Sequence, residues 1–155
     1  MDSHRHLELL LTEGERLAAM PADALDAPVP GVPGWTLEQV VRHTGKVHQW
    51  VTGMLLAGPE GTPPTDLPGL PKGPDCLPAY REALGEVLAQ LASHEPEQLA
   101  LTFDGVQPAA FWFRRQAHEV ADVESDPTLT SFADTEIRLD RKSVGEGHSV
   151  ADRGD

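Results

Sequence analysis

The chain has 155 residues, a length that suits one domain with a single core. It carries 25 acidic against 12 basic side chains, a formal net charge of −13. This balance argues against binding to nucleic acids or to an anionic membrane surface, because both need a basic face. No run of the sequence reaches the ~18 apolar residues of a membrane span, and the N-terminus does not have the pattern of a signal peptide.

The single cysteine, Cys76, excludes an internal disulfide and a cysteine-based zinc site. Such sparse cysteine usage fits a cytoplasmic location. We expect the Cys76 thiol to lie at the edge of a loop and to take no part in chemistry.

Hydrophobic periodicity predicts an all-α protein, a four-helix bundle with helices near residues 3–20, 36–57, 77–93 and 108–125. The second helix is the best defined, because Thr36 and Gln39 have the spacing of a capping box ahead of a broad apolar face. Pro108 suits the first turn of the last helix. The segment LALTFDGVQP before it is expected to be briefly extended.

Two linkers are rich in proline. The first, ADALDAPVPGVPGW at 22–35, is expected to follow an extended path. The second, GPEGTPPTDLPGLPKGPD at 58–75, is a loop with six prolines and four glycines. Extended chain of this length spans up to ~60 Å, twice the ~30 Å of a 20-residue helix. The Pro/Gly-rich crossover can therefore return along the whole bundle, which predicts that helices 2 and 3 lie parallel.

Residues 126–155 have few large apolar side chains and no sustained period, which predicts a poorly ordered tail after a bundle at 1–125. The pentapeptide DRKSV at 140–144 can be encoded by GATCGGAAGAGCGTC, which resembles a common sequencing-adapter string. This favours the interpretation that the residues after Leu139 are not native sequence.

Most of the seven histidines are expected at the surface, His4 and His6 among them because the N-terminus frays. His94 lies at a helix end, where it can oppose the helix dipole. His43 differs, because it shares a stripe that points into a core. The other members of this stripe are Val40, Val47, Trp50 and Met54. An imidazole buried there needs a hydrogen-bond partner for each ring nitrogen, or a metal ion.

Glu119 falls seven residues after Trp112 and therefore roughly on the same helix face. A carboxylate facing a core must be paired, protonated or bound to a metal. A salt bridge to Arg115, one turn back, is the simpler alternative. Helical bundles build metal sites from imidazoles and carboxylates on facing helices. His43 and Glu119 are therefore candidate ligands for zinc, iron, manganese or nickel.

Two stretches, PVPGVPGWTLEQVVRHTGKVHQWV at 28–51 and AAFWFRRQAHEVA at 109–121, resemble the N-terminal metal-binding domain of the mycothiol-dependent maleylpyruvate isomerase family. That family belongs to the DinB-like group of four-helix bundles. Its pattern is a proline-rich lead-in and Gly-Trp, a helix with a histidine, and later a His-Glu-x-x-x-His helix. The resemblance implies a DinB-like bundle with a long crossover between helices 2 and 3.

The resemblance also implies a divalent metal, most often zinc, bound by the first-motif histidine and by the glutamate and final histidine of the second motif. Carried over residue by residue, the first two are His43 and Glu119. Val123 occupies the position of the final histidine, and a valine cannot bind a metal. A short deletion would bring Asp122 into that role, three residues after Glu119 and four after His118. A weakened or absent metal site is the other interpretation.

In the resembled family the metal activates the sulfur of a low-molecular-weight thiol, mycothiol, because a coordinating cation lowers the pKa of the thiol. The thiolate adds to the double bond of an electrophilic acid and allows cis–trans isomerisation, or attacks an electrophile in an S-transfer. We therefore expect an isomerase or transferase for a small-molecule substrate, impaired by Val123.

The alternative is a non-catalytic or truncated bundle without a bound metal. Arg114 and Arg115 either bind a carboxylate, since arginine offers a planar fork, or balance the acidic surface.

Overall fold

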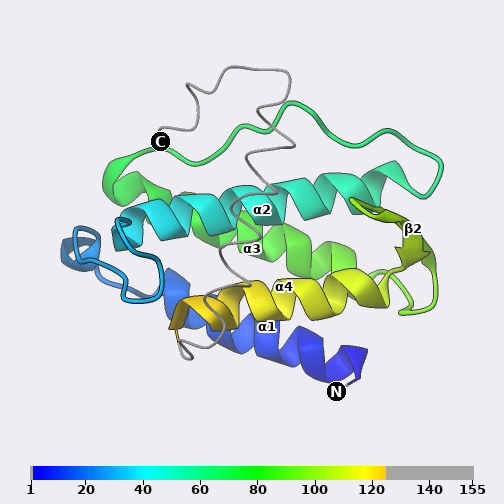
Figure 1. The fold of residues 1–155 in the computed structure, drawn as a ribbon, viewed down its shortest axis with the longest axis horizontal. Helices are drawn as coiled ribbons and strands as arrows, with labels where there is room; N and C mark the ends of the chain where they lie inside the picture. Colours follow the sequence, from blue (N-terminus) through cyan, green and yellow to red (C-terminus); the bar gives the residue numbers. More distant parts are fainter. Residues whose placement is uncertain (1, 125–155) are drawn as a thin grey trace.

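The computed structural model describes residues 2–124, with side chains described through Val120. The predicted tail at 126–155 lies outside the described residues. Within them the chain forms four helices, which confirms the predicted all-α bundle (Figure 1). They are α1 (Ser3–Ala18), α2 (Leu37–Ala57), α3 (Cys76–Ala92) and α4 (Ala110–Glu124). No helix in this part of the chain is both long and apolar enough to cross a membrane.

The crossover at 58–75 runs back along α2, so that α3 begins beside the start of α2 and the two helices lie parallel, as predicted (Figure 1). Side chains of α2 hold this return path. Gly69 N donates to Gln49 Oε1 at 2.9 Å, and Arg42 Nε donates to Leu70 O at 3.1 Å. A Cβ at Gly45 would lie only 2.5 Å from a methyl of Leu70. The small residue therefore lets the loop pack directly on the helix.

Three pairs of side chains set the register between α2 and α4. His43 lies against Glu119, His48 bonds Gln116, and Trp50 packs on Trp112. Rising numbers on α2 pair with falling numbers on α4, so the two helices run antiparallel (Figure 1). This pairing places the two candidate ligands on facing surfaces of one helix pair.

A β-hairpin connects α3 to α4, which confirms the extended segment predicted there. Strand β1 (Leu99–Thr102) pairs antiparallel with β2 (Gly105–Pro108). Pro108 was predicted in the first turn of the last helix, and this is wrong. It ends β2 opposite Leu99, and Ala109 N extends the pairing by donating to Gln98 O at 2.7 Å. Helix α4 begins only after that bond.

The linker at 22–35 is compact, not extended as predicted. It contains a short 3-10 helix, Ala22–Ala24, and an antiparallel bridge between Pro28 and Thr36 closes its second half into a tight loop. Val29 N donates to Trp35 O at 3.2 Å inside this loop. The prolines therefore shape a loop that holds Trp35 beside the start of α2.

Cys76 does not lie at a loop edge. It is the first residue of α3 and is fully buried in the core. Burial raises the pKa of its thiol, which favours the protonated form over the nucleophilic thiolate.

The capping box at the start of α2 is formed as predicted. Gln39 N donates to Thr36 Oγ1 at 3.3 Å, and Thr36 N donates to Gln39 Oε1 at 2.9 Å.

We expect Thr36→Ala to lower the free energy of unfolding by about 1 kcal/mol, because one helix donor loses its acceptor. Urea denaturation measures this, with Thr65→Ala in the exposed crossover as the matched control. Equal stability of the two variants would contradict a stabilising cap.

Candidate metal site

His43 and Glu119 come together between α2 and α4, as the sequence predicted for two facing helices. His43 Nε2 lies 3.6 Å from Glu119 Oε2, with 10% of the His43 side chain and 3% of the Glu119 side chain exposed. A carboxylate this deeply buried must be paired, protonated or bound to a metal, because an unpaired buried charge costs several kcal/mol.

The donor atoms of this pair fit the separation that a metal ion imposes. Nitrogen and oxygen ligands lie ~2.1 Å from zinc, so two of them on a tetrahedral ion are roughly 3.4 Å apart. The observed 3.6 Å is close to that value. Imidazole and carboxylate are also ligand types that zinc accepts.

The structure does not complete a ligand set within the described side chains. Among them, no group of three or more His, Cys, Asp and Glu residues is arranged to hold a metal ion. The backbone of α4 continues through Asp122 and Val123, but the side chains of these two residues lie outside the described part. Asp122 as a third ligand therefore stays a prediction.

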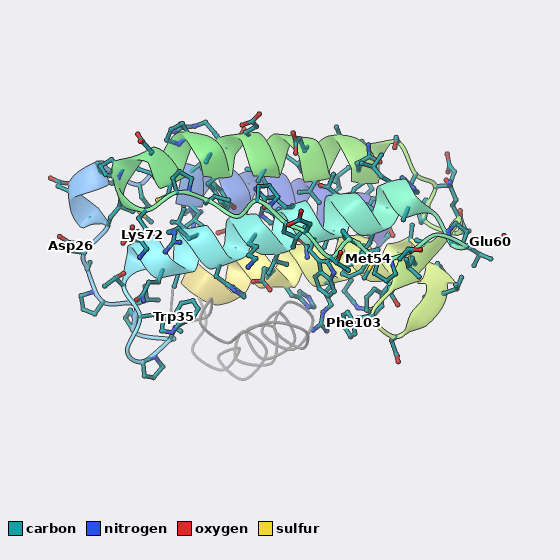
Figure 2. All side chains as sticks on the ribbon, turned by 90° about the horizontal axis from the view of Figure 1, so that it is seen from above. Asp26, Trp35, Met54, Glu60, Lys72 and Phe103 are labelled. Atoms are coloured by element: carbon teal, nitrogen blue, oxygen red, sulfur yellow. The ribbon has the colours of Figure 1, made fainter. Side chains whose placement is uncertain are left out.

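Trp35 packs against the imidazole of His43. Its ring meets the imidazole of His43 edge to face, with 5.7 Å between centroids and 78° between planes. This contact restricts rotation of the imidazole and so orients Nε2 toward Glu119. Figure 2 shows Trp35 and Phe103 near opposite ends of the stretch where α2 and α4 lie side by side.

His48 forms a second polar contact, fully buried, which the sequence analysis missed. Its Nδ1 lies 2.7 Å from Gln116 Oε1 and its Nε2 lies 3.3 Å from the hydroxyl of Tyr80, so one imidazole joins α2, α3 and α4. The pKa of His48 is lowered to about 4, mainly by desolvation and to a smaller extent by nearby His43, while the hydrogen bond to Gln116 acts in the opposite direction. The neutral ring therefore donates from Nδ1 to the amide oxygen and accepts from the phenol at Nε2.

The sequence did contain a signal for His48. A second stripe on α2 has the same three- and four-residue spacing as the stripe of His43, and all its members are buried. They are Val41, Thr44, His48, Val51 and Leu55. Two apolar stripes on one helix indicate that neighbouring elements cover a broad face of it. Polar residues within either stripe are then expected to be buried in the core.

His6 was expected at the surface, and this is wrong. Only 6% of it is exposed, because α1 packs on α4 and brings its ring edge to face with the ring of His118, 5.9 Å between centroids. Burial is the main cause that lowers the pKa of both histidines. The next cause is His118 for His6 and Arg114 for His118.

His4 is exposed as predicted and pairs with Glu8. His94 Nδ1 contacts Gln90 O at the end of α3, which agrees with the predicted role at a helix end.

The side chains of the two neighbouring arginines of α4 contact different aromatic rings. Arg114 is exposed, with its guanidinium 5.9 Å from the centroid of the Phe111 ring. Arg115 is half-buried and lies 4.8 Å over the ring of Phe103, which belongs to the hairpin turn. The sequence pattern gave no reason to distinguish Arg114 from Arg115. The difference in their contacts arises because the hairpin places Phe103 beside Arg115.

Comparison with known proteins identifies the family to which this arrangement belongs. Residues 9–121 match the family model of the mycothiol maleylpyruvate isomerase N-terminal domain. The fold is similar to the crystal structure of a histidine-to-alanine mutant of the mycothiol-dependent maleylpyruvate isomerase, with a TM-score of 0.63 and 14% identity over 89% of this chain and 67% of that chain. At this identity the likeness shows the fold alone. No curated protein sequence matches the chain.

Burial of a neutral His48 predicts a pH-dependent loss of stability. Its pKa is about 4 in the folded chain and ~6.5 in an unfolded one, so between these values the unfolded chain binds the additional proton. Stability therefore falls as the pH falls, by about 2 kcal/mol from pH 8 to pH 5 for this residue. In His48→Gln that part of the loss should disappear, as measured by urea denaturation at both pH values. The control is His4→Gln at an exposed site, and equal pH dependence of the two variants would contradict the assignment.

Proposed function

Because the chain belongs to the mycothiol maleylpyruvate isomerase N-terminal domain family, we propose that it acts on a small electrophilic acid with the help of a metal ion and mycothiol. The activity is that of an isomerase or S-transferase of the maleylpyruvate isomerase type. The observation that carries this proposal is the buried pair of His43 and Glu119, with 3.6 Å between Nε2 and Oε2.

In this proposal His43 Nε2 and Glu119 Oε2 hold a divalent ion, which we take to be zinc. When bound, such an ion stabilises the thiolate of a thiol ligand, because its charge favours loss of the proton. Glu119 is buried, and the low dielectric of the interior strengthens the attraction between a carboxylate and a cation there. Trp35 fixes the orientation of the His43 ring and shields one side of it from water.

We also propose that the chain functions in the cytoplasm. Mycothiol is used as a reduced thiol, and the single cysteine of this chain fits a reducing compartment.

Val123 supports a second candidate function, that of a non-catalytic bundle that binds no metal. It stands where the resembled pattern has the third ligand, four residues after Glu119 on α4. In that case the ion pair of His43 and Glu119 is a structural contact between α2 and α4, and it contributes stability only.

Metal binding separates the two functions. We expect the purified full chain to bind close to one zinc ion, and His43→Ala or Glu119→Gln to weaken zinc binding by more than ~10-fold, since each removes a ligand. Competition with a chromophoric chelator measures the affinity. The control is His94→Ala, which removes a histidine bonded to Gln90 O at the end of α3. A zinc content near zero in the unsubstituted chain would rule out the proposed metal-dependent function.

The alignment of α4 with the family motif predicts a gain of affinity. Val123→His restores a histidine four residues after Glu119, on the next turn of the same helix, and should raise zinc affinity by more than ~10-fold. The same chelator competition measures it, with Ala89→His on the exposed side of α3 as the control for an added histidine. An unchanged affinity in Val123→His would show that the alignment is wrong.

A further inference from the structure

Gln116 uses only one end of its side-chain amide. Its Oε1 lies 2.7 Å from His48 Nδ1, and His48 Nε2 lies 3.3 Å from the Tyr80 hydroxyl. The other amide atom, Gln116 Nε2, is shielded from solvent and has no hydrogen-bond partner within the described part of the chain. Because the whole residue is fully buried, bulk solvent does not reach this donor. A buried donor of this kind calls for a partner, since leaving it unsatisfied is costly.

Either orientation of the amide leaves one polar end of Gln116 over. With Oε1 toward His48, the ring donates from Nδ1 and the NH2 group of the amide remains. With the amide turned by 180°, Nε2 would donate to Nδ1 of the other tautomer, and the carbonyl oxygen would remain. His48 therefore satisfies one end of the amide in both cases, and a partner for the other end must be able to donate or accept.

Thr44 supplies a second buried polar atom close by. It is 1% exposed and lies one helical turn before His48 on α2. Its Oγ1 has no hydrogen-bond partner among the described residues. A threonine inside a helix can bond to the carbonyl oxygen three or four residues earlier. Thr44 does not form that bond, so its hydroxyl is left for a group outside its own helix.

The pairing of α2 with α4 brings these two polar atoms to neighbouring levels of the core. Gln116 lies opposite His48. Glu119 lies opposite His43, and Thr44 directly follows His43 on α2. One helical turn rises ~5.4 Å. A single water molecule with two hydrogen bonds of ~2.9 Å joins polar atoms up to roughly 5.8 Å apart, which matches this spacing.

We propose that one water molecule is bound inside the bundle between Gln116 and Thr44, at the interface of α2 and α4. Water fits as the ligand because it both donates and accepts, so it satisfies either end of the amide together with a hydroxyl. Both partners are uncharged and offer no counter-charge to an ion. The site goes beyond the proposed function, since it requires no bound metal.

The water also stabilises the register of the two helices that carry the candidate ligands. Thr44 adjoins His43 along α2, and Gln116 lies one turn before Glu119 on α4. Bonds to both side chains tie these two helix segments together. The bond between His48 and Gln116 gains as well, because the amide cannot rotate without losing the water.

A crystal structure of the full chain, at a resolution that shows ordered water, tests the site directly. We expect a water within about 3.2 Å of both Thr44 Oγ1 and the amide atom of Gln116 that does not face His48. Thr44→Val has nearly the same shape without the hydroxyl and should lose this water. Thr44→Ser keeps the hydroxyl and should retain it.

Urea denaturation measures whether the two side chains share a ligand. We expect Thr44→Val and Gln116→Leu to be coupled, because the shared water is already lost in either variant. The change in the unfolding equilibrium constant of the double variant should differ from the product of the single changes by more than about twofold. The matched control is Thr65→Val in the exposed crossover, whose effect should combine with that of Gln116→Leu without coupling.

Three results would overturn the inference. The first is a crystal structure in which Thr44 Oγ1 bonds to a carbonyl of its own helix, or in which no ordered water contacts the Gln116 amide. The second is additive effects of Thr44→Val and Gln116→Leu. The third is a water that persists in Thr44→Val, and this variant carries the test by itself where Gln116→Leu does not fold. The zinc content of the chain bears on the proposed function and leaves this test unaffected.

Discussion

The antiparallel packing of α2 on α4 places polar side chains inside an apolar core, and each of them must be satisfied there because burial of an unpaired polar group costs free energy. His48 meets this condition with Gln116 on one side and Tyr80 on the other. His43 and Glu119 form an ion-pair contact, with 3.6 Å between Nε2 and Oε2. The two contacts are less than two turns apart on α2. They therefore fix the register of the helix pair, and with it the position of every side chain in the candidate site.

This helix pairing depends on the long crossover. A short connection would have placed α3 antiparallel to α2, whereas the segment at 58–75 returns along α2 and lets the two run parallel (Figure 1). Bonds from Arg42 and Gln49 hold the crossover on the side of α2 that carries Gly45. The stripe of His43 on the same helix stays available to α4. One helix thus supports a loop on one face and a site on another.

The sequence predicted those features whose cause is local or periodic. The four helices follow from apolar spacing and caps, and His43 and Glu119 follow from stripes that point inward. Features set by tertiary contacts were missed. His6 is near a terminus that frays in isolation, but α4 covers it. Pro108 fits a helix start, but strand pairing with Leu99 prevails. Arg114 and Arg115 are equivalent in the sequence, and only the hairpin that carries Phe103 makes them different.

The charges of the described interior explain why a cation suits this bundle. Buried His6 and His48 have lowered pKa values and are neutral near pH 7, while Glu119 is the buried carboxylate among the described residues. His43 Nε2 lies 3.6 Å from its Oε2, and this is the pair proposed to hold a metal ion. A nitrogen ligand must be unprotonated to bind a metal ion, so zinc binding at the proposed site would become weaker in acid. In the proposed site a bound ion would replace the contact that joins α2 and α4 in the metal-free bundle, and this would link the register of the two helices to the chemistry of the site.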